Sequence, residues 1–338
     1  MKAAVLHELK KPMVVEEVER PVPGEGEVLI KVEASGVCHS DLHVAEGDWK
    51  QFAGITKLPL IVGHEVAGKV VELGPGVREL KPGDRVGVPW IYWTCGECEF
   101  CREGNENLCV KQKITGVTVN GGYAEFIKAP ASHAIRIPDA VSSVQAAPLF
   151  CAGVTVYRAI MQAKPQRGQR LAVFGVGGLG HLAVQVAVHL GLEVSAVDVA
   201  DDKLALARSL GATNTFNAAA SNVVKEIRRL GGAHIVLVTS GSKAAYDTAF
   251  YCLRPTGTLL AVGLPANEIS FPAIMMAAGE VNIKASAVGT REDLKQVLAL
   301  AAAGKLHCQV AARPLADVNA VFEDMRAGKI AGRVVLTM

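Results

Sequence analysis

Four cysteines fall within fifteen residues of this chain, and their spacing is its strongest constraint. Cys95, Cys98, Cys101 and Cys109 lie in the run CGECEFCREGNENLC. Four thiolates can surround one tetrahedral Zn²⁺, and so short a segment has no room for a packed core of its own. We therefore expect a closed, structural zinc site. Disulfides or idle surface thiols are disfavoured because the start of the chain lacks a secretory signal.

The composition excludes several classes of protein. The chain has 338 residues, of which 50% are hydrophobic and 20% charged, and this is enough for two domains with sizeable cores. A net charge of +2 gives no argument for binding nucleic acid or an anionic membrane. No apolar stretch approaches the length of a membrane-spanning helix. We expect a cytoplasmic protein that acts on a small molecule.

The sequence changes character near residue 151. Before it, short β-favouring runs such as EVLIKVEASG and HEVAGKVVELG are separated by turn sequences including GPG, KPGD and NGG. After it, apolar strands alternate with helical patterns, which predicts a parallel sheet buried on both faces. We expect an α/β chain of two domains, with the last fifty residues returning to the first.

A glycine-rich turn opens the second part of the chain. GVGGLG follows the strand-like RLAVF and precedes a helical pattern, the context that makes this otherwise weak motif specific for a dinucleotide. Its glycines allow a tight turn and close approach of a pyrophosphate to the helix N-terminus. The alternative is a turn that merely permits helix–strand packing. The six residues are Gly175, Val176, Gly177, Gly178, Leu179 and Gly180.

Asp198 ends the next predicted strand and bears on which dinucleotide binds. Its carboxylate can accept hydrogen bonds from both adenosine ribose hydroxyls and would repel a 2′-phosphate. VADDK follows without an arginine, so NAD is favoured over NADP. Lys203 could also approach the ribose, although a solvated lysine in the first turn of a helix fits nearly as well.

Three further segments carry metal-ligand residues. Cys38 lies in GVCHSDLH, His64 in GHEVAGKVVELGPGV, and Cys151 in PLFCAGVTVY. Each alone is weak, since a single buried cysteine is usually a small core residue. Together, two cysteines and a histidine with water in the fourth position form a catalytic zinc arrangement.

These motifs, together with CAGVTVY and the terminal GRVVL, resemble the zinc-dependent alcohol dehydrogenases of the medium-chain dehydrogenase/reductase superfamily. The resemblance runs over essentially the whole chain and is strongest to the tetrameric NAD-dependent enzymes of bacteria and yeast. It implies a GroES-like, β-rich catalytic domain over 1–152 and 288–338, with the structural zinc lobe at about 90–112. It also implies a Rossmann domain, a doubly wound parallel sheet that binds NAD, over 153–287.

The resemblance assigns roles around a catalytic zinc. Cys38, His64 and Cys151 would bind the metal, which gives two zinc ions per subunit when the four-cysteine site is included. Glu65 would lie behind the metal and enter its coordination during ligand exchange. Asp41 would accept a hydrogen bond from the His64 imidazole and fix its orientation, where the alternative is a loop carboxylate in an Asx turn.

The same resemblance implies a proton relay. Ser40 would take the alcohol proton and pass it through a ribose hydroxyl to His43, since histidine is the side-chain type best suited to release a proton to solvent near neutral pH. Many relatives carry threonine at the position of Ser40, and the hydroxyl is retained here. His39 would approach the cofactor pyrophosphate, although an exposed loop histidine is the default without the family.

Other roles depend on the resemblance more heavily. Arg333 would pair with a cofactor phosphate, and Val262 and Val288 would line the nicotinamide pocket, although ordinary strand packing explains the two valines equally well. Trp49 and Trp90 would line a narrow substrate channel that favours small primary alcohols, or else anchor the core. The loop between Trp49 and Pro59 has a few more residues than in close relatives, and it would affect which substrates the enzyme accepts.

The expected reaction is reversible oxidation of a small alcohol by hydride transfer to NAD⁺, in a homotetramer. The alternatives within the enzyme class are zinc-dependent reductases that act on larger alcohols, polyols or aldehydes. A non-catalytic nucleotide-binding relative is disfavoured because all seven zinc ligands are present. Zinc storage would leave the GVGGLG unit unexplained.

Overall fold

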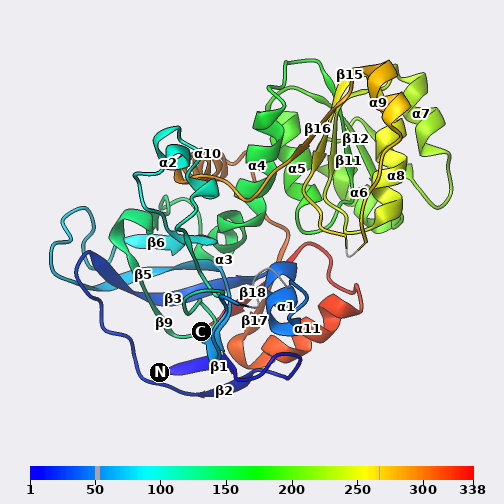
Figure 1. Cartoon of the computed structure of the whole chain (residues 1–338). Helices are drawn as coiled ribbons and strands as arrows, with labels where there is room; N and C mark the ends of the chain where they lie inside the picture. The colour runs from blue at the N-terminus through cyan, green and yellow to red at the C-terminus, as the bar shows by residue number, and fades with distance from the viewer. Residues whose placement is uncertain (50–53, 266) are drawn as a thin grey trace. The chain divides into compact units, whose positions relative to one another are not determined.

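The computed structural model describes residues 1–49, 54–265 and 267–338, and two compact units divide the chain. The first unit comprises Met1–Cys151, Thr290–Ala303 and Cys308–Met338, and the second comprises Ala152–Gly289 with Gly304–His307. Both chain termini lie in the first unit (Figure 1). The main segment of the second unit runs from 152 to 289, whereas the domain division expected from the sequence runs from 153 to 287.

A seven-stranded sheet forms the framework of the first unit. Its path is β10-β6-β5-β3-β18-β17, and β9 also pairs with β3. The strands are β3 (Glu27–Val37), β5 (Glu65–Leu73), β6 (Arg85–Val88), β9 (Phe126–Pro130), β10 (Ile135–Arg136), β17 (Val310–Pro314) and β18 (Arg333–Thr337). The last fifty residues thus return to this sheet, as expected.

Smaller elements surround that sheet. A three-stranded sheet has the order β2-β1-β4, and β7 pairs with β8. These strands are β1 (Lys2–Leu6), β2 (Val14–Glu17), β4 (Leu60–Ile61), β7 (Ile91–Trp93) and β8 (Lys113–Ile114). The helices and 3₁₀ turns are α1 (His39–Glu46), α2 (Glu99–Arg102), η2 (Glu106–Leu108), η3 (Ala131–His133), α3 (Ser143–Ala146), η4 (Ala147–Phe150), α10 (Arg291–Ala302), η5 (Leu315–Asp317) and α11 (Val318–Arg326).

The second unit is a six-stranded parallel sheet in the order β13-β12-β11-β14-β15-β16. The strands are β11 (Arg170–Phe174), β12 (Glu193–Asp198), β13 (Asn214–Asn217), β14 (Ala233–Val238), β15 (Leu253–Ala261) and β16 (Asn282–Ala285). The helices are α4 (Ala152–Gln162), α5 (Gly180–His189), α6 (Asp201–Ser209), α7 (Val223–Arg229), α8 (Lys243–Tyr251) and α9 (Ala273–Gly279). This strand order is that of the doubly wound dinucleotide fold.

The central strands of the second unit are buried almost throughout, as continuous apolar strands between covering helices should be. The expected parallel sheet is confirmed. Among the described residues, no single helix is long and apolar enough to cross a membrane. A bent pair, Ser143–Phe150 with Ala152–Gln162, passes the same length and composition criteria when taken together.

Strand register fixes where the chemistry of the first unit gathers. β3 is antiparallel to both β5 and β18, with Gly36 opposite Glu65 and Val37 opposite Val334. The carboxyl end of β3 therefore meets the amino ends of its two neighbours. Residues at 38, 64–65 and 333, far apart in the chain, come to one edge of one sheet.

Candidate active site and metal centres

Four candidate metal ligands converge at that edge. Cys38, His64, Glu65 and Cys151 are all buried, and their donor atoms lie within 4.8 Å of one another. The His64 Nε2 atom and the Glu65 Oε2 atom are buried and find no hydrogen-bond partner in the described part of the chain. Two thiols and an imidazole nitrogen are donors that Zn²⁺ prefers, so this set fits a zinc ion.

Helix α1 orients these ligands. Cys38 is its N-cap residue, and its backbone N–H donates to Asp41 Oδ2 at 3.0 Å. The other oxygen of Asp41, Oδ1, lies 2.6 Å from Nδ1 of His64. Because Nδ1 is engaged, the imidazole presents Nε2 to the thiols, as a metal-binding histidine requires.

The thiols have opposed acidities. A hydrogen bond from Cys151 and the nearby His64 lower the pKa of Cys38, although burial acts the other way. The same hydrogen bond, together with burial, raises the pKa of Cys151. A bound dication would favour the thiolate form of both residues.

Glu65, the fourth member of the cluster, pairs with Arg333. Burial raises the pKa of Glu65 to about 7, while the Arg333 guanidinium opposes this shift. Gly36 makes room for this carboxylate, since a Cβ atom there would lie 1.9 Å from Glu65 Oε2. The guanidinium of Arg333 is therefore engaged by Glu65, and its role at a cofactor phosphate stays a prediction.

Aromatic rings extend from the ligand cluster to the predicted relay. The ring of Trp90 contacts His64 edge-on, with centroids 4.7 Å apart. Trp49 lies 6.2 Å from Trp90 and 5.2 Å from His43, again between ring centroids. The two tryptophans predicted to line the channel thus lie between a ligand and His43. Of the loop between Trp49 and Pro59, residues 50–53 lie outside the described residues.

The two predicted relay residues, Ser40 and His43, lie on α1, as does His39, which is predicted to approach the cofactor pyrophosphate. His39 is exposed and Ser40 is half-buried at the start of the helix. Nδ1 of His43 is 2.8 Å from Asp48 Oδ2, a partner that sequence reasoning missed. Asp48 directly follows the left-handed Gly47 that ends α1, and this C-cap glycine was the available signal.

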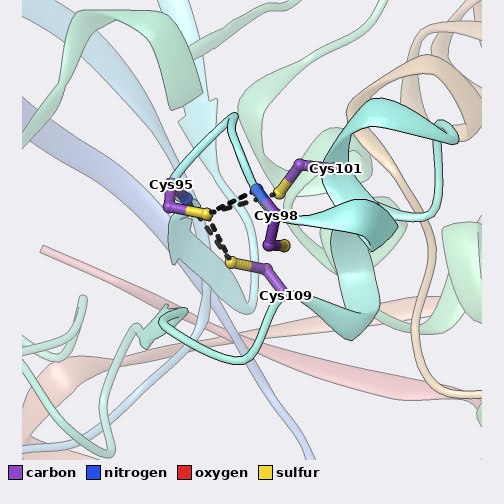
Figure 2. A group of neighbouring side chains, drawn as sticks. All are labelled: Cys95, Cys98, Cys101 and Cys109. Carbon is purple, nitrogen blue, oxygen red and sulfur yellow. Dashed lines mark hydrogen bonds between the residues drawn. The ribbon is translucent and has the colours of Figure 1, made fainter.

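The four cysteines of the lobe also come together (Figure 2). Their sulfur atoms lie within 4.8 Å of one another, and Cys109 Sγ is 3.5 Å from Cys95 Sγ. The backbone N–H of Cys98 donates to Cys95 Sγ at 3.4 Å, an arrangement that stabilises thiolate charge. Four sulfurs in this space fit one tetrahedral zinc with no open position.

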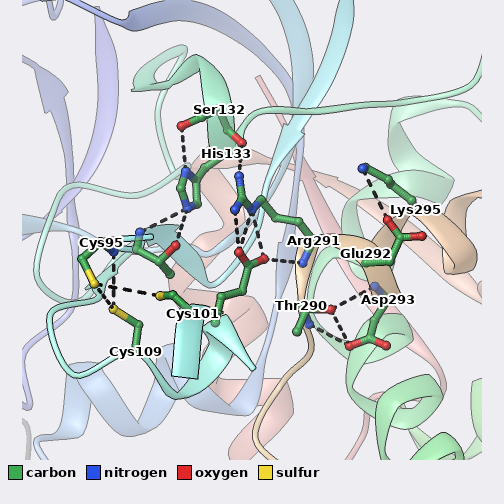
Figure 3. Close-up of polar contacts among 12 residues, drawn as sticks. Cys95, Cys101, Cys109, Ser132, His133, Thr290, Arg291, Glu292, Asp293 and Lys295 are labelled. Carbon is green, nitrogen blue, oxygen red and sulfur yellow. Dashed lines mark hydrogen bonds and ion pairs between the residues drawn. The ribbon is translucent and has the colours of Figure 1, made fainter. Parts of the chain in front are cut away.

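A salt bridge anchors this lobe to α10 (Figure 3). The carboxylate of Glu106, in η2 between Cys101 and Cys109, accepts from the Nε, Nη2 and backbone N–H of Arg291 at 2.6–3.0 Å. Arg291 Nη1 donates to the carbonyl of Ser132 at 2.8 Å. Neither Glu106 nor Arg291 was predicted, because a single charged residue carries no pattern in sequence.

His133 belongs to the same group of polar contacts as Arg291 and Ser132 (Figure 3). Its Nε2 accepts from the backbone N–H of Thr94 at 3.1 Å, immediately before Cys95. Burial, and then the charge of Arg291, lower the pKa of His133 to about 4. The ring is therefore neutral near pH 7 and can act as this acceptor.

In the second unit, GVGGLG joins β11 to α5. Gly175 has φ 92°, and a Cβ atom on Gly180 would lie 1.8 Å from the Gly175 carbonyl oxygen. A Cβ atom on Gly177 would meet nothing within 4 Å. Gly180 is thus required by packing, whereas Gly177 leaves open space where a pyrophosphate could approach.

Asp198 ends β12 beside this turn. Its carboxylate accepts from the backbone N–H groups of Val176, Val199 and Ala200 at 2.7–3.1 Å. A carboxylate has about four acceptor positions, so capacity remains for a ribose hydroxyl. Lys203 is half-buried on α6.

The two predicted nicotinamide-pocket valines differ in backbone conformation. Val262 is buried just after β15. Val288 is half-buried at φ 41°, a value that a β-branched residue rarely adopts. Such strain is most often found at functional positions, but the role of Val288 stays a prediction.

The fold and donor sets define a dinucleotide-binding fold with two clusters of candidate metal ligands, and comparison with known proteins gives its family. Residues 24–139 match the model of the alcohol dehydrogenase GroES-like domain, and residues 178–303 match that of zinc-binding dehydrogenases. An alcohol dehydrogenase of Geobacillus stearothermophilus is 48% identical over 99% of both chains, and one of Rhizobium meliloti is 45% identical over 100% and 99%. The chain belongs to the zinc-binding alcohol dehydrogenase family.

Solved structures agree with this assignment. The alcohol dehydrogenase of the archaeon Aeropyrum pernix is 36% identical, covers 100% of both chains and superposes with a TM-score of 0.93. Acetophenone reductase from Geotrichum candidum, solved in complex with NAD, is 30% identical over 100% of this chain and 97% of its own, with a TM-score of 0.90. The resemblance inferred from the motifs is confirmed, as is the GroES-like and Rossmann architecture.

The glycine-rich turn generates a paired prediction. Gly180→Ala should lower the free energy of unfolding by about 3 kcal/mol, because its Cβ overlaps backbone that cannot move aside. Gly177→Ala should leave stability almost unchanged but weaken NAD binding by about tenfold, the loss of one hydrogen bond to a charged group. Urea unfolding and cofactor titration measure the two effects, and equal destabilisation by both variants would contradict this account.

The salt bridge between Glu106 and Arg291 generates a second prediction. Arg291→Ala should cost about 2 kcal/mol in urea unfolding at pH 7, since it leaves the half-buried Glu106 carboxylate without its cation. Despite the opposing effect of burial, Arg291 lowers the pKa of Glu106 below 4.5, so this contribution is present above pH 4.5 and is lost as the pH falls further. Lys295→Ala, in the exposed pair with Glu292, is the control and should cost almost nothing.

Proposed function

We propose that this chain is an NAD-dependent alcohol dehydrogenase that reversibly oxidises small primary, and some secondary, alcohols to aldehydes or ketones. One observation carries the proposal: three buried soft or borderline donors, Cys38, His64 and Cys151, converge while Nε2 of His64 has no partner in the described part of the chain. Family membership and the glycine-rich turn supply the cofactor half of the argument.

We assign two zinc ions to each chain. Cys38, His64 and Cys151 would hold the catalytic ion, and the four cysteines of the lobe would hold the structural one. At the first site, zinc would supply Lewis acidity that lowers the pKa of an alcohol hydroxyl. Glu65, within the same cluster, is the residue that could enter the coordination during ligand exchange.

The residues of the chain then manage the proton and the substrate. With the cofactor bound, Ser40 would take the alcohol proton and give up its own hydroxyl proton, which a ribose hydroxyl would relay to His43 and on to solvent. Asp48 fixes the Nδ1 side of His43, which leaves Nε2 to exchange protons. Trp49 and Trp90 restrict the width of the channel and exclude water.

NAD supplies the hydride acceptor, and the second unit binds it. The glycine-rich turn receives the pyrophosphate, and Asp198 and Lys203 receive the adenosine ribose. The family resemblance assigns His39 and Arg333 to the phosphates of the bound cofactor, and Val262 and Val288 would line the nicotinamide pocket. Support for NAD over NADP comes from the half-buried Asp198 carboxylate, whose charge opposes a 2′-phosphate.

A zinc-dependent reductase for larger alcohols or aldehydes is the second candidate. The two tryptophans, which fill space beside His64, favour the smaller substrates. The presence of both sets of zinc ligands disfavours a non-catalytic nucleotide-binding relative.

We further propose a cytoplasmic homotetramer. An apolar surface on the second unit supports association with other copies. Helix α9 buries none of its residues, and Ile274 on α9 and the nearby Leu264 are 75% and 62% exposed. The edge strand β16 lies in the same region of the sheet. Large exposed apolar side chains beside a sheet edge are typical of protein–protein interfaces.

The metal assignment is tested with Cys38→Ala. The variant should lose essentially all turnover of ethanol and propanol and one of two zinc ions per chain, while it still binds NAD. Cys252→Ala, which removes a buried cysteine outside both clusters, serves as the control and should keep both ions. Undiminished turnover in Cys38→Ala would refute the assignment, and a panel of longer alcohols distinguishes the second candidate.

The cofactor assignment is tested with Asp198→Asn. This change removes the charge that repels a 2′-phosphate and keeps one acceptor oxygen, which can retain the bonds from Val199 and Ala200 while the bond from Val176 is lost. The ratio of kcat/KM for NAD⁺ to that for NADP⁺ should fall by about tenfold or more, equivalent to about 1.4 kcal/mol. An unchanged ratio would mean that Asp198 does not face the ribose.

A further inference from the structure

The strongest unassigned feature of the first unit is the hydroxyl of Tyr123. This side chain is fully buried, and its hydroxyl donates to Asp41 Oδ2 at 2.8 Å across 82 residues of sequence. Asp41 in turn binds His64 through its other oxygen. A continuous buried chain thus runs from Tyr123 through Asp41 to the imidazole of a proposed zinc ligand.

The backbone holds Tyr123 in this position with little freedom. The N–H groups of Gly121, Gly122 and Tyr123 donate to the carbonyls of Ile61, Gly63 and Val62 at 2.6–3.0 Å. The segment that carries the tyrosine is thereby bound to the segment that leads directly into His64. The NGG sequence was predicted to be a turn. In the structure it also holds the Tyr123 side chain beside the segment that leads into His64.

Glycine at position 63 is a condition of this contact. Gly63 has φ 98°, and a Cβ atom there would lie 2.4 Å from Cδ1 of the Tyr123 ring. Gly122 is equally restricted, since its Cβ atom would lie 2.3 Å from Cγ2 of Val66. The tyrosine ring therefore packs directly on the backbone that precedes the ligand.

The Asp41 carboxylate is held by three donors in a buried environment. These are His64 Nδ1, the Tyr123 hydroxyl and the Cys38 backbone N–H, at 2.6, 2.8 and 3.0 Å. Burial, and then the neighbouring Asp41 charge, raise the pKa of Tyr123 well above its ordinary value. The phenol therefore remains a hydrogen-bond donor over the working pH range.

We propose that Tyr123 is a positioning residue for the catalytic zinc site, acting through Asp41 to hold the His64 imidazole in its metal-binding orientation. This inference rests on the proposed function. Phenylalanine would fill the same apolar space against Phe322, whose ring lies 6.5 Å away between centroids. The hydroxyl alone supplies the link to Asp41, so its removal isolates the proposed role.

The test measures zinc release from the holoenzyme to a colorimetric chelator. The two ions should be released in separate phases, and the phase that disappears in Cys38→Ala is the catalytic one. Tyr123→Phe should accelerate the catalytic phase by roughly tenfold to a hundredfold, the usual effect of removing a group that supports a ligand. Release from the four-cysteine site should be unchanged. Asp41→Asn, one step closer to the metal, should produce the same selective acceleration.

Tyr92→Phe is the matched control. Tyr92 is buried in the same unit, and its hydroxyl donates to the Lys128 carbonyl at 3.2 Å, outside the ligand cluster. It should leave the catalytic phase unaltered. A Tyr123→Phe rate within about twofold of the parent would overturn the proposal, as would equal acceleration at both metal sites, which indicates general loosening. A parent protein that binds no zinc at Cys38, His64 and Cys151 would instead refute the proposed function.

Discussion

The antiparallel pairing of β3 with β5 and β18 is the constraint on which the site depends. It places the residues after β3 beside those that begin β5, and brings Arg333 to the same edge from 268 residues away. A one-residue slip in either pairing would turn alternate side chains to the opposite face of the sheet. The registers that close the sheet are therefore also those that assemble the ligand cluster.

The buried charged groups at that edge lie where a cation would neutralise them. A buried ion pair such as Glu65–Arg333 is weak evidence for stability, because desolvation offsets most of the attraction. A role in the chemistry explains its position better. Glu65 keeps one oxygen without a partner among the described residues, and the adjacent thiols have opposed pKa shifts. A dication would resolve each of these features at once.

Features with a local spacing were predictable from the sequence, and long-range contacts were not. The four-cysteine run and GVGGLG each occupy fewer than twenty residues, so their local spacing is enough to predict their geometry. Cys38, His64 and Cys151 could be grouped from their ligand chemistry, but each segment alone was a weak signal, and the roles of the surrounding residues came only with the family resemblance. The Tyr123–Asp41 and Glu106–Arg291 contacts span 82 and 185 residues between side chains that carry no periodic pattern. Only the sheet register and helix packing decide such pairs.

Glycines belong both to the local sequence motifs and to the long-range contacts. In sequence they read as turns, yet Gly36 makes room for Glu65, Gly63 for the ring of Tyr123, and Gly180 for the carbonyl of Gly175. In each case a side chain or carbonyl beside a proposed binding site occupies the space that a Cβ atom would take. Such contacts leave the backbone little room to shift, and a ligand set held by an immobile backbone requires less reorganisation when it binds. The glycines that accompany these motifs are therefore part of the sites themselves, since they let groups that bind and groups that support come within contact distance.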